Sequence, residues 1–213
     1  MQVFEFGKPE AGILLIQPVD DHDLSGIESE VSRIRELAGE DFRLLAVKVP
    51  RWNRDLSPWP APPVFGSEGF GDGAGVFLEE ILTLAGDRPR TKILGGYSLA
   101  GLFALWAGTQ TEAFTGVAAA SPSVWFPGFT EFLARQPFRA RSVALSLGDR
   151  EEKTRNPVMA RVGDCIRETK ALLDRQGVNC CLEWNEGNHF RDPDLRTAKA
   201  FARVMLQITS ADS

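Results

Sequence analysis

Ser98 lies in a pattern that is typical of an activated serine nucleophile. Gly96–Ala100 reads GYSLA, with a small residue two positions before and two positions after the serine, and Gly101 follows directly. A strand that turns sharply into a helix needs such small neighbours, because a larger side chain would collide with the turn. An apolar stretch, TKILGGY, precedes Ser98, and a helix-forming stretch, LAGLFALWAG, follows it. The pattern favours a nucleophile elbow over an ordinary helix N-cap.

One of the two histidines suits the role of general base for this serine. A serine hydroxyl is a weak nucleophile near pH 7 and needs a neighbouring base to take its proton. In hydrolases with such an elbow the chain order is nucleophile, acid, histidine. His189 obeys this order, whereas His22 precedes the serine. Gly187 and Asn188 predict a tight turn that brings the imidazole toward Ser98, so we predict that His189 is the base.

The acid that orients this histidine should follow the apolar run Arg141–Gly148. Asp149, Glu151 and Glu152 stand there, within the sequence DREEK. We favour Glu151, because a residue a few positions beyond a strand end can reach inward. Asp149 is the second choice, and a solvated run of charges is the third interpretation.

Two backbone amides should stabilise the oxyanion that forms during acyl transfer. One is the amide of Leu99, directly after the nucleophile, and the other belongs to the loop after the first apolar run. There we predict Val19 or Asp20, since Pro18 has no N–H. The cluster Asp20–Asp23 could suggest a metal site, but a helix cap explains it more simply, so we predict no metal.

Six short apolar runs predict the strands of the sheet that must hold these residues. Their near-continuous hydrophobicity is typical of strands buried on both faces. They are Gly12–Val19, Phe42–Val49, Thr91–Ser98, Gly116–Ser121, Arg141–Gly148 and Asn179–Trp184.

Segments with helical periodicity lie between these runs. Apolar spacing predicts helices from Ile27 to Leu37, from Val158 to Leu173 and from Leu195 to Leu206. The last has Asp192 as a plausible N-cap and Pro193 at its first position. The alternation predicts an α/β fold, a three-layer α/β/α sandwich around a mostly parallel sheet. Chemistry in such sheets lies at the carboxyl ends of the strands.

Composition bounds the class of protein. The 213 residues suit one domain, 1–213, and a formal charge of −5 without a basic run argues against nucleic acid. Three cysteines, two of them adjacent, form neither a disulfide framework nor a zinc-ligand pattern. No secretory signal or membrane-length apolar segment is visible. We expect a cytoplasmic protein without membrane contact, and the sequence leaves its oligomeric state open.

The assembled motifs make the sequence similar to a known family. It resembles the putative-esterase family of α/β-hydrolases, which contains esterase D and the enterochelin esterases. The resemblance covers nearly the whole chain and rests on GGYSLAG, RDLSPWP and GNHF. The chain departs from the family in its short length and in offering few basic groups near the entrance, Arg51 and Arg54 among them. A general esterase is therefore expected, rather than one specific for anionic siderophores.

The resemblance also implies roles for individual residues. In that family an Arg-Asp-x-Ser/Thr-Pro loop borders the active-site entrance, which implies that Arg54, Asp55 and Trp59 line the substrate side. The family's Gly-x-x-acid pattern falls on Gly148 and Glu151, which adds support for Glu151 as the acid.

These observations predict a serine hydrolase that needs no cofactor and cleaves a small or medium carboxylic ester through an acyl-enzyme. The Pro- and Gly-rich segment 51–75 predicts an irregular connection whose Trp52, Trp59 and Phe65 form a cleft wall or anchor the loop on the core. An acyltransferase or thioesterase would use the same triad, because water and a rival acceptor compete for one acyl-enzyme. A non-catalytic binding module on the same fold is the third alternative.

Overall fold

The structure, a computed structural model, describes residues 1–88 and 91–211. These residues form one seven-stranded sheet in which β1 is antiparallel to its neighbour and the other strands are parallel. In spatial order the strands are β1 (Gln2–Gly7), β3 (Phe42–Lys48), β2 (Ile13–Val19), β4 (Thr91–Tyr97), β5 (Gly116–Ala120), β6 (Ser142–Gly148) and β7 (Asn179–Asn185). The predicted mostly parallel sheet is confirmed, and each of the six apolar runs became a strand.

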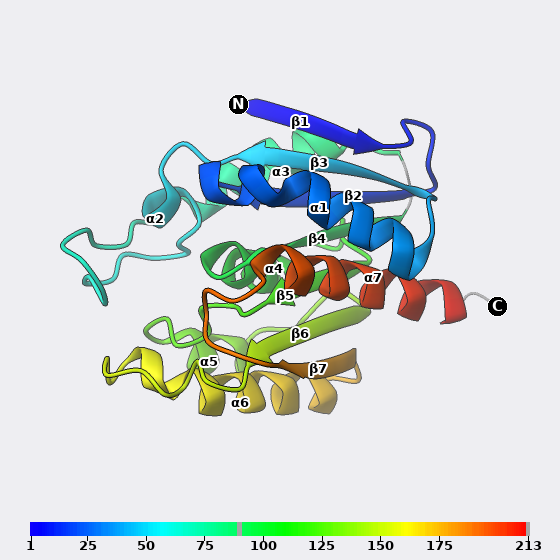
Figure 1. Cartoon of the computed structure of the whole chain (residues 1–213). Helices are drawn as coiled ribbons and strands as arrows, with labels where there is room; N and C mark the ends of the chain where they lie inside the picture. The colour runs from blue at the N-terminus through cyan, green and yellow to red at the C-terminus, as the bar shows by residue number, and fades with distance from the viewer. Residues whose placement is uncertain (89–90, 212–213) are drawn as a thin grey trace.

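Helices cover both faces of the sheet, which makes the predicted three layers (Figure 1). On one face α1 (Asp21–Ala38) packs beside α7 (Pro193–Ala211), and α7 crosses β4, β5 and β6. The other face carries α3 (Ala74–Ala85), α4 (Leu99–Gln110) and α6 (Val162–Arg175), with the short α5 (Phe129–Leu133) against α6. Each face has its own apolar core, so the sheet is buried on both sides.

Strand β1 and helix α3 were not predicted. The sequence QVFEFG has three apolar residues interrupted by Glu5, and none of its residues is fully buried, which is typical of an edge strand rather than of the continuous runs that mark the interior. It pairs with β3, where Arg43 forms an ion pair with Glu5 at 2.8 Å.

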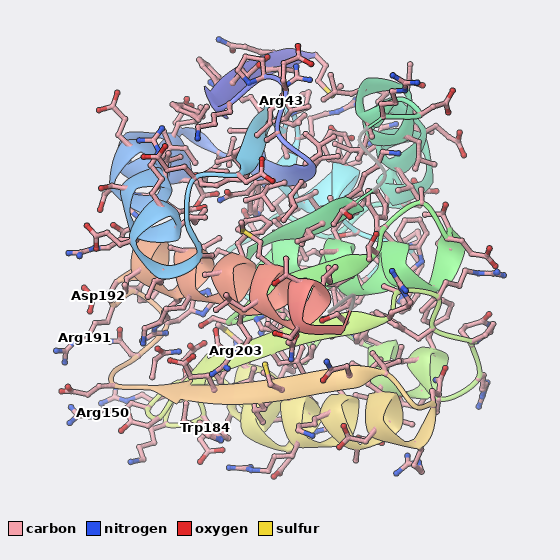
Figure 2. The ribbon with its side chains drawn as sticks, turned by 90° about the vertical axis from the view of Figure 1, so that its right-hand side faces the viewer. Arg43, Arg150, Trp184, Arg191, Asp192 and Arg203 are labelled. Atoms are coloured by element: carbon pink, nitrogen blue, oxygen red, sulfur yellow. The ribbon has the colours of Figure 1, made fainter. Side chains whose placement is uncertain are left out.

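Figure 2 labels Arg43 at this edge and Trp184 of β7 at the opposite edge. Trp184 is 42% exposed, with the Arg167 guanidinium 5.0 Å from its ring centroid.

The segment that follows β3 lies beyond the carboxyl ends of the strands (Figure 1). We predicted an irregular connection here, and this is partly wrong. One helical turn, α2 (Trp52–Asp55), and an antiparallel bridge between Ala61 and Phe70 interrupt it. Carbonyls of α2 and its neighbours accept hydrogen bonds from Gly71, Gly73 and Ala74, which ties the two ends of the segment together. The segment is therefore an internally hydrogen-bonded loop that lies beside the carboxyl ends of the strands.

No helix within residues 1–88 and 91–211 combines the length and the apolar character that crossing a membrane requires.

Candidate active site

Ser98 stands at the turn between β4 and α4 in a backbone conformation that residues other than glycine rarely adopt, with φ 56° and ψ −119°. Small neighbours make the turn possible. A Cβ at Gly96 would lie 2.6 Å from the Cβ of Ala100, and one at Gly101 would lie 3.0 Å from the Gly96 carbonyl oxygen. The predicted strand–turn–helix geometry is present, and local strain of this kind is typical of functional sites.

The structure brings His189 to Ser98. The Nε2 atom of His189 lies 3.0 Å from the Ser98 Oγ. Gly187, two residues earlier, has φ 104°, and a Cβ there would lie 2.5 Å from the Arg191 side chain, so the turn before His189 requires glycine. The Tyr97 hydroxyl donates a hydrogen bond of 2.7 Å to the His189 carbonyl oxygen and anchors the loop beside the nucleophile.

Of the three acid candidates, Glu151 is the one that contacts the imidazole. Its Oε2 atom lies 2.7 Å from His189 Nδ1. Its Oε1 atom accepts hydrogen bonds from the Gly148 amide at 2.7 Å, the Ser121 hydroxyl at 2.7 Å and the Arg196 guanidinium at 2.8 Å. Burial raises the pKa of Glu151, but the His189, Ser121 and Gly148 hydrogen bonds outweigh it and bring the pKa below its ordinary value.

The other two acid candidates serve neighbouring contacts. Asp149 Oδ1 accepts a hydrogen bond of 2.8 Å from the Gly187 amide, so it supports the turn before the histidine. Glu152 forms an ion pair with Arg167 at 3.4 Å on the surface. Neither carboxylate is hydrogen-bonded to the His189 ring.

Several residues of this network were not predicted from the sequence. They are Tyr97, Ser121, Ser123 and Arg196, which lie behind or beside the three expected residues. Ser123 Oγ lies 3.2 Å from Ser98 Oγ. Burial raises the pKa of Tyr97 to about 12, so its hydroxyl keeps its proton and remains a donor. Of these four residues, only Tyr97 and Ser121 could have been suspected from the sequence, because they lie at the ends of predicted strands.

The predicted oxyanion donors differ in how they lie. Leu99 is the first residue of α4, so its amide has no acceptor within the helix. Val19 accepts a hydrogen bond from the Val49 amide, on the β3 side of β2. A strand residue directs its N–H and C=O to the same side, so the Val19 amide faces away from β4. The prediction of Val19 is therefore not supported.

Asp20, the alternative, is better placed. Ile16 pairs with Leu94 in the β2–β4 register, so the same offset brings Asp20 level with Ser98. Strand alternation, carried one residue past the end of β2, directs its amide to the side opposite that of Val19. This amide also donates a hydrogen bond of 3.2 Å to Asp23 Oδ2, as part of the capping box of α1.

A cavity of about 530 Å³ opens in front of Ser98 and His189. Its walls are mainly apolar and include Trp52, Phe65, Trp125, Met159 and Phe190. Phe65 and Phe190 are 51% and 84% exposed, so two aromatic rings border the opening.

The acidic groups in this cavity come from the start of α1. Asp20 and Asp23 line it, together with His22. Burial and the neighbouring Asp20 raise the pKa of Asp23 to about 6. The predicted helix cap accounts for this cluster, because the Asp20 side chain accepts a hydrogen bond of 2.8 Å from the Asp23 amide. In the described part of the chain, no group of three or more His, Cys, Asp and Glu side chains is arranged to hold a metal ion.

The residues that the family resemblance assigned to the substrate side lie away from the cavity. Arg54 is exposed and packs over Gly71, and Asp55 is buried with its carboxylate on the amide and guanidinium of Arg51. Trp59 donates a hydrogen bond of 2.9 Å to the Pro127 carbonyl and packs on Phe126. None of the three lines the cavity. Trp52 and Asn53 of the same segment face the cavity instead.

Solved structures with this architecture are known. An IroE-like serine hydrolase from Shewanella oneidensis superposes with a TM-score of 0.68 at 15% identity, over 91% of this chain and 70% of its own. A siderophore hydrolase, EstA from Aspergillus nidulans, gives a TM-score of 0.68 at 19% identity, over 100% and 95% of the two chains. This chain has the α/β-hydrolase fold.

A third solved structure with this fold belongs to a longer chain. The enterobactin esterase FES from Shigella flexneri matches with a TM-score of 0.64 at 16% identity, over 99% of this chain and 56% of its own. No protein-family model matches the sequence, and no curated protein does. At identities this low the similarity shows a shared fold and does not by itself show a shared activity.

Proposed function

We propose that this chain is a serine hydrolase that cleaves carboxylic esters through an acyl-enzyme intermediate. The observation that carries the proposal is the unbroken series of hydrogen bonds from Glu151 through His189 to Ser98, at 2.7 and 3.0 Å, beside an apolar cavity. A hydroxyl, an imidazole and an ionised carboxylate in contact are the parts that nucleophilic acyl transfer needs. The fold shared with serine hydrolases supports the same activity.

The proposed reaction has two halves. His189 Nε2 takes the proton of Ser98 as its Oγ attacks the ester carbonyl carbon, and the same imidazole then gives that proton to the leaving alkoxide. Water next loses a proton to His189 and attacks the acyl-enzyme, and the imidazolium returns that proton to Ser98 Oγ as the acyl–oxygen bond breaks, which releases the acid. Glu151 remains ionised throughout and stabilises the imidazolium, in line with its lowered pKa.

We assign the oxyanion donors to the amides of Leu99 and Asp20. The first has no helical acceptor, and the extended strand register supports the second over Val19. The Asp20 amide donates to Asp23 Oδ2 in this structure, so on substrate binding it would exchange that acceptor for the oxyanion. Two backbone donors on the developing negative charge are the usual arrangement for tetrahedral intermediates of acyl transfer.

The cavity favours small or medium esters with an apolar or aromatic part. Aromatic walls from Trp52, Trp125 and Phe190 suit such groups. The side chains of Asp20 and Asp23 bring negative charge, and no lysine or arginine lies among the described residues of the lining. Neutral or cationic esters should therefore react better than anionic ones. Two of the structural neighbours are a siderophore hydrolase and an enterobactin esterase, but this charge pattern does not favour an anionic siderophore here.

The three cysteines are free thiols, and Cys180 and Cys181 do not pair with each other. This supports the proposal that the protein works in a reducing compartment such as the cytoplasm.

Hydrolysis of p-nitrophenyl acetate and butyrate tests the proposal. Wild type should turn both over, and Ser98→Ala and His189→Ala should each lose about 10³-fold or more, because the members of a triad act as a unit. Ser210→Ala, an exposed hydroxyl near the end of α7, is the matched control and should behave as wild type. Folded wild type without turnover would overturn the proposal and favour a binding module. Adding alcohol acceptors separates hydrolysis from acyl transfer.

A further inference from the structure

The first turn of α7 carries an arginine that the proposed reaction does not use. Arg196 is 1% exposed and is the largest fully buried side chain in the described chain. A buried charge is costly unless it is paired and hydrogen-bonded. Its partners therefore indicate what the charge is for.

Each end of the guanidinium contacts a different part of the site. Nη1 donates to the Tyr97 hydroxyl at 3.2 Å, the Ser121 hydroxyl at 3.2 Å and Glu151 Oε1 at 2.8 Å. Nη2 donates to the carbonyl oxygens of Glu186 at 3.0 Å and Asn188 at 2.9 Å. One side chain thus joins the ends of β4, β5 and β6 to the loop that carries His189.

The surrounding chain leaves room for this group. A Cβ at Gly148 would lie 2.9 Å from Nη1 and 2.3 Å from the Gly187 carbonyl oxygen. The absence of a side chain at position 148 therefore lets the guanidinium and the histidine loop approach the end of β6 together.

We propose that Arg196 is a positioning residue: it keeps Glu151 ionised and fixes the histidine loop so that His189 meets both Ser98 and Glu151. This inference rests on the proposed hydrolase activity. Arg196 contacts none of the reacting atoms, so it acts through Glu151 and the loop.

Two properties of arginine suit this role. Its fixed positive charge lies 2.8 Å from Glu151 Oε1, where an opposite charge favours the ionised carboxylate, and the remaining titratable neighbours are His189 and Tyr97. Its planar fork supplies several donors at set angles, whereas a lysine ammonium is a single point with three donors. Five acceptors at 2.8–3.2 Å match the fork.

Two substitutions separate charge from geometry. We expect Arg196→Gln to lower kcat about 10- to 100-fold with KM within about twofold of wild type, since small displacements of catalytic groups are costly. In the pH profile of kcat/KM, the acid limb (the fall in activity at low pH) should move to higher pH, because the Glu151–His189 pair is easier to protonate without the cation. Arg196→Lys should restore the acid limb but not kcat, because an ammonium cannot serve all five acceptors.

Arg203→Gln provides the matched control. Arg203 lies on the same helix and is exposed (labelled in Figure 2), so both kcat and the acid limb should stay at wild-type values. Circular dichroism and thermal unfolding establish that each variant is folded. If Arg196→Gln does not fold, the kcat of Arg196→Lys decides.

The outcomes are distinct. Folded Arg196 variants with wild-type kcat and acid limb overturn the inference, as does a loss of thermal stability alone. If wild type itself neither hydrolyses p-nitrophenyl butyrate nor reacts with a fluorophosphonate, the proposed function fails and the inference fails with it. An active wild type with unaffected variants removes only the role of Arg196.

Discussion

Two buried glutamates in this molecule have opposite protonation behaviour. Glu151, after β6, and Glu30, on α1, are 8% and 3% exposed. Burial raises the pKa of both carboxyls, but the pKa of Glu151 ends below its ordinary value and that of Glu30 well above it. The depth of burial is similar, so the neighbours decide the difference.

The neighbours of Glu151 are donors, and those of Glu30 are mostly not. Glu30 Oε2 accepts one hydrogen bond of 3.3 Å from the Gln17 side chain, and its Oε1 has no hydrogen-bond partner among the described residues. The nearby carboxylates of Asp23 and Asp194 raise its pKa further. The surroundings of Glu151 therefore favour the anion that can stabilise an imidazolium, whereas those of Glu30 favour its protonated form.

The largest expected effect is the loss of activity on substitution of Glu151. Glu151→Gln should lower kcat about 10³- to 10⁴-fold, because a neutral amide can neither fix the imidazole tautomer nor stabilise its cation. Glu152→Gln, a neighbouring surface residue, is the control and should stay within about twofold. Hydrolysis of p-nitrophenyl butyrate measures both, and a loss below tenfold in Glu151→Gln would contradict its role.

The second effect is on stability at Glu30. The folded carboxyl holds its proton to a higher pH than the unfolded one, so wild-type stability should fall as the pH rises from about the ordinary value of 4.5 through the folded pKa. Glu30→Gln lacks this loss and should be more stable than wild type at pH 8, by on the order of 1 kcal/mol.

Thermal unfolding of both proteins from pH 5 to pH 8 measures this difference. The gain should shrink toward pH 5, and kcat should stay within about twofold of wild type. A gain independent of pH would show that Glu30 is not the titrating group.

The smallest effect concerns Asp23, whose pKa of about 6 is also raised by burial. Its ordinary value is 3.8, so its contribution to stability is lost as the pH rises from about 4 to above 6. Asp23→Asn should reduce the pH dependence of the unfolding free energy in that range, by less than about 1 kcal/mol, since the group borders an open cavity. Chemical denaturation at pH 4.5 and 7 tests this, and parallel curves for the two proteins would refute it.

Local patterns led to the residues that the structure brings together at the elbow. Ser98 ends a predicted strand, and Glu151 and His189 each follow one, so the carboxyl-end rule and the chain order led to the serine and the histidine. These rules left three candidates for the acid, and Glu151 was favoured over Asp149 by its reach and by the family resemblance. The six parallel strands were equally readable, because near-continuous apolar runs mark them. The edge strand β1 has a short, interrupted apolar pattern and was therefore not predicted.

What escaped prediction depends on contacts between distant segments. Arg196 lies 45 residues from Glu151 along the chain, within a helix whose periodicity marks only its apolar face. Val19 and Asp20 differ by the direction of one amide, which follows from strand pairing and not from residue type. Trp59 packs on Phe126 and donates to the Pro127 carbonyl instead of lining the cavity, and these partners lie 67 and 68 residues away along the chain.

The central claim is that Ser98 is the activated nucleophile, and covalent labelling tests it most directly. Wild type treated with a fluorophosphonate probe should gain one adduct, which peptide mass spectrometry assigns to Ser98 and not to Ser123, whose hydroxyl lies 3.2 Å away. Ser98→Ala should remain unlabelled, while Ser123→Ala should still accept the probe. Folded wild type that takes up no probe, or an adduct on Ser123, would contradict the account.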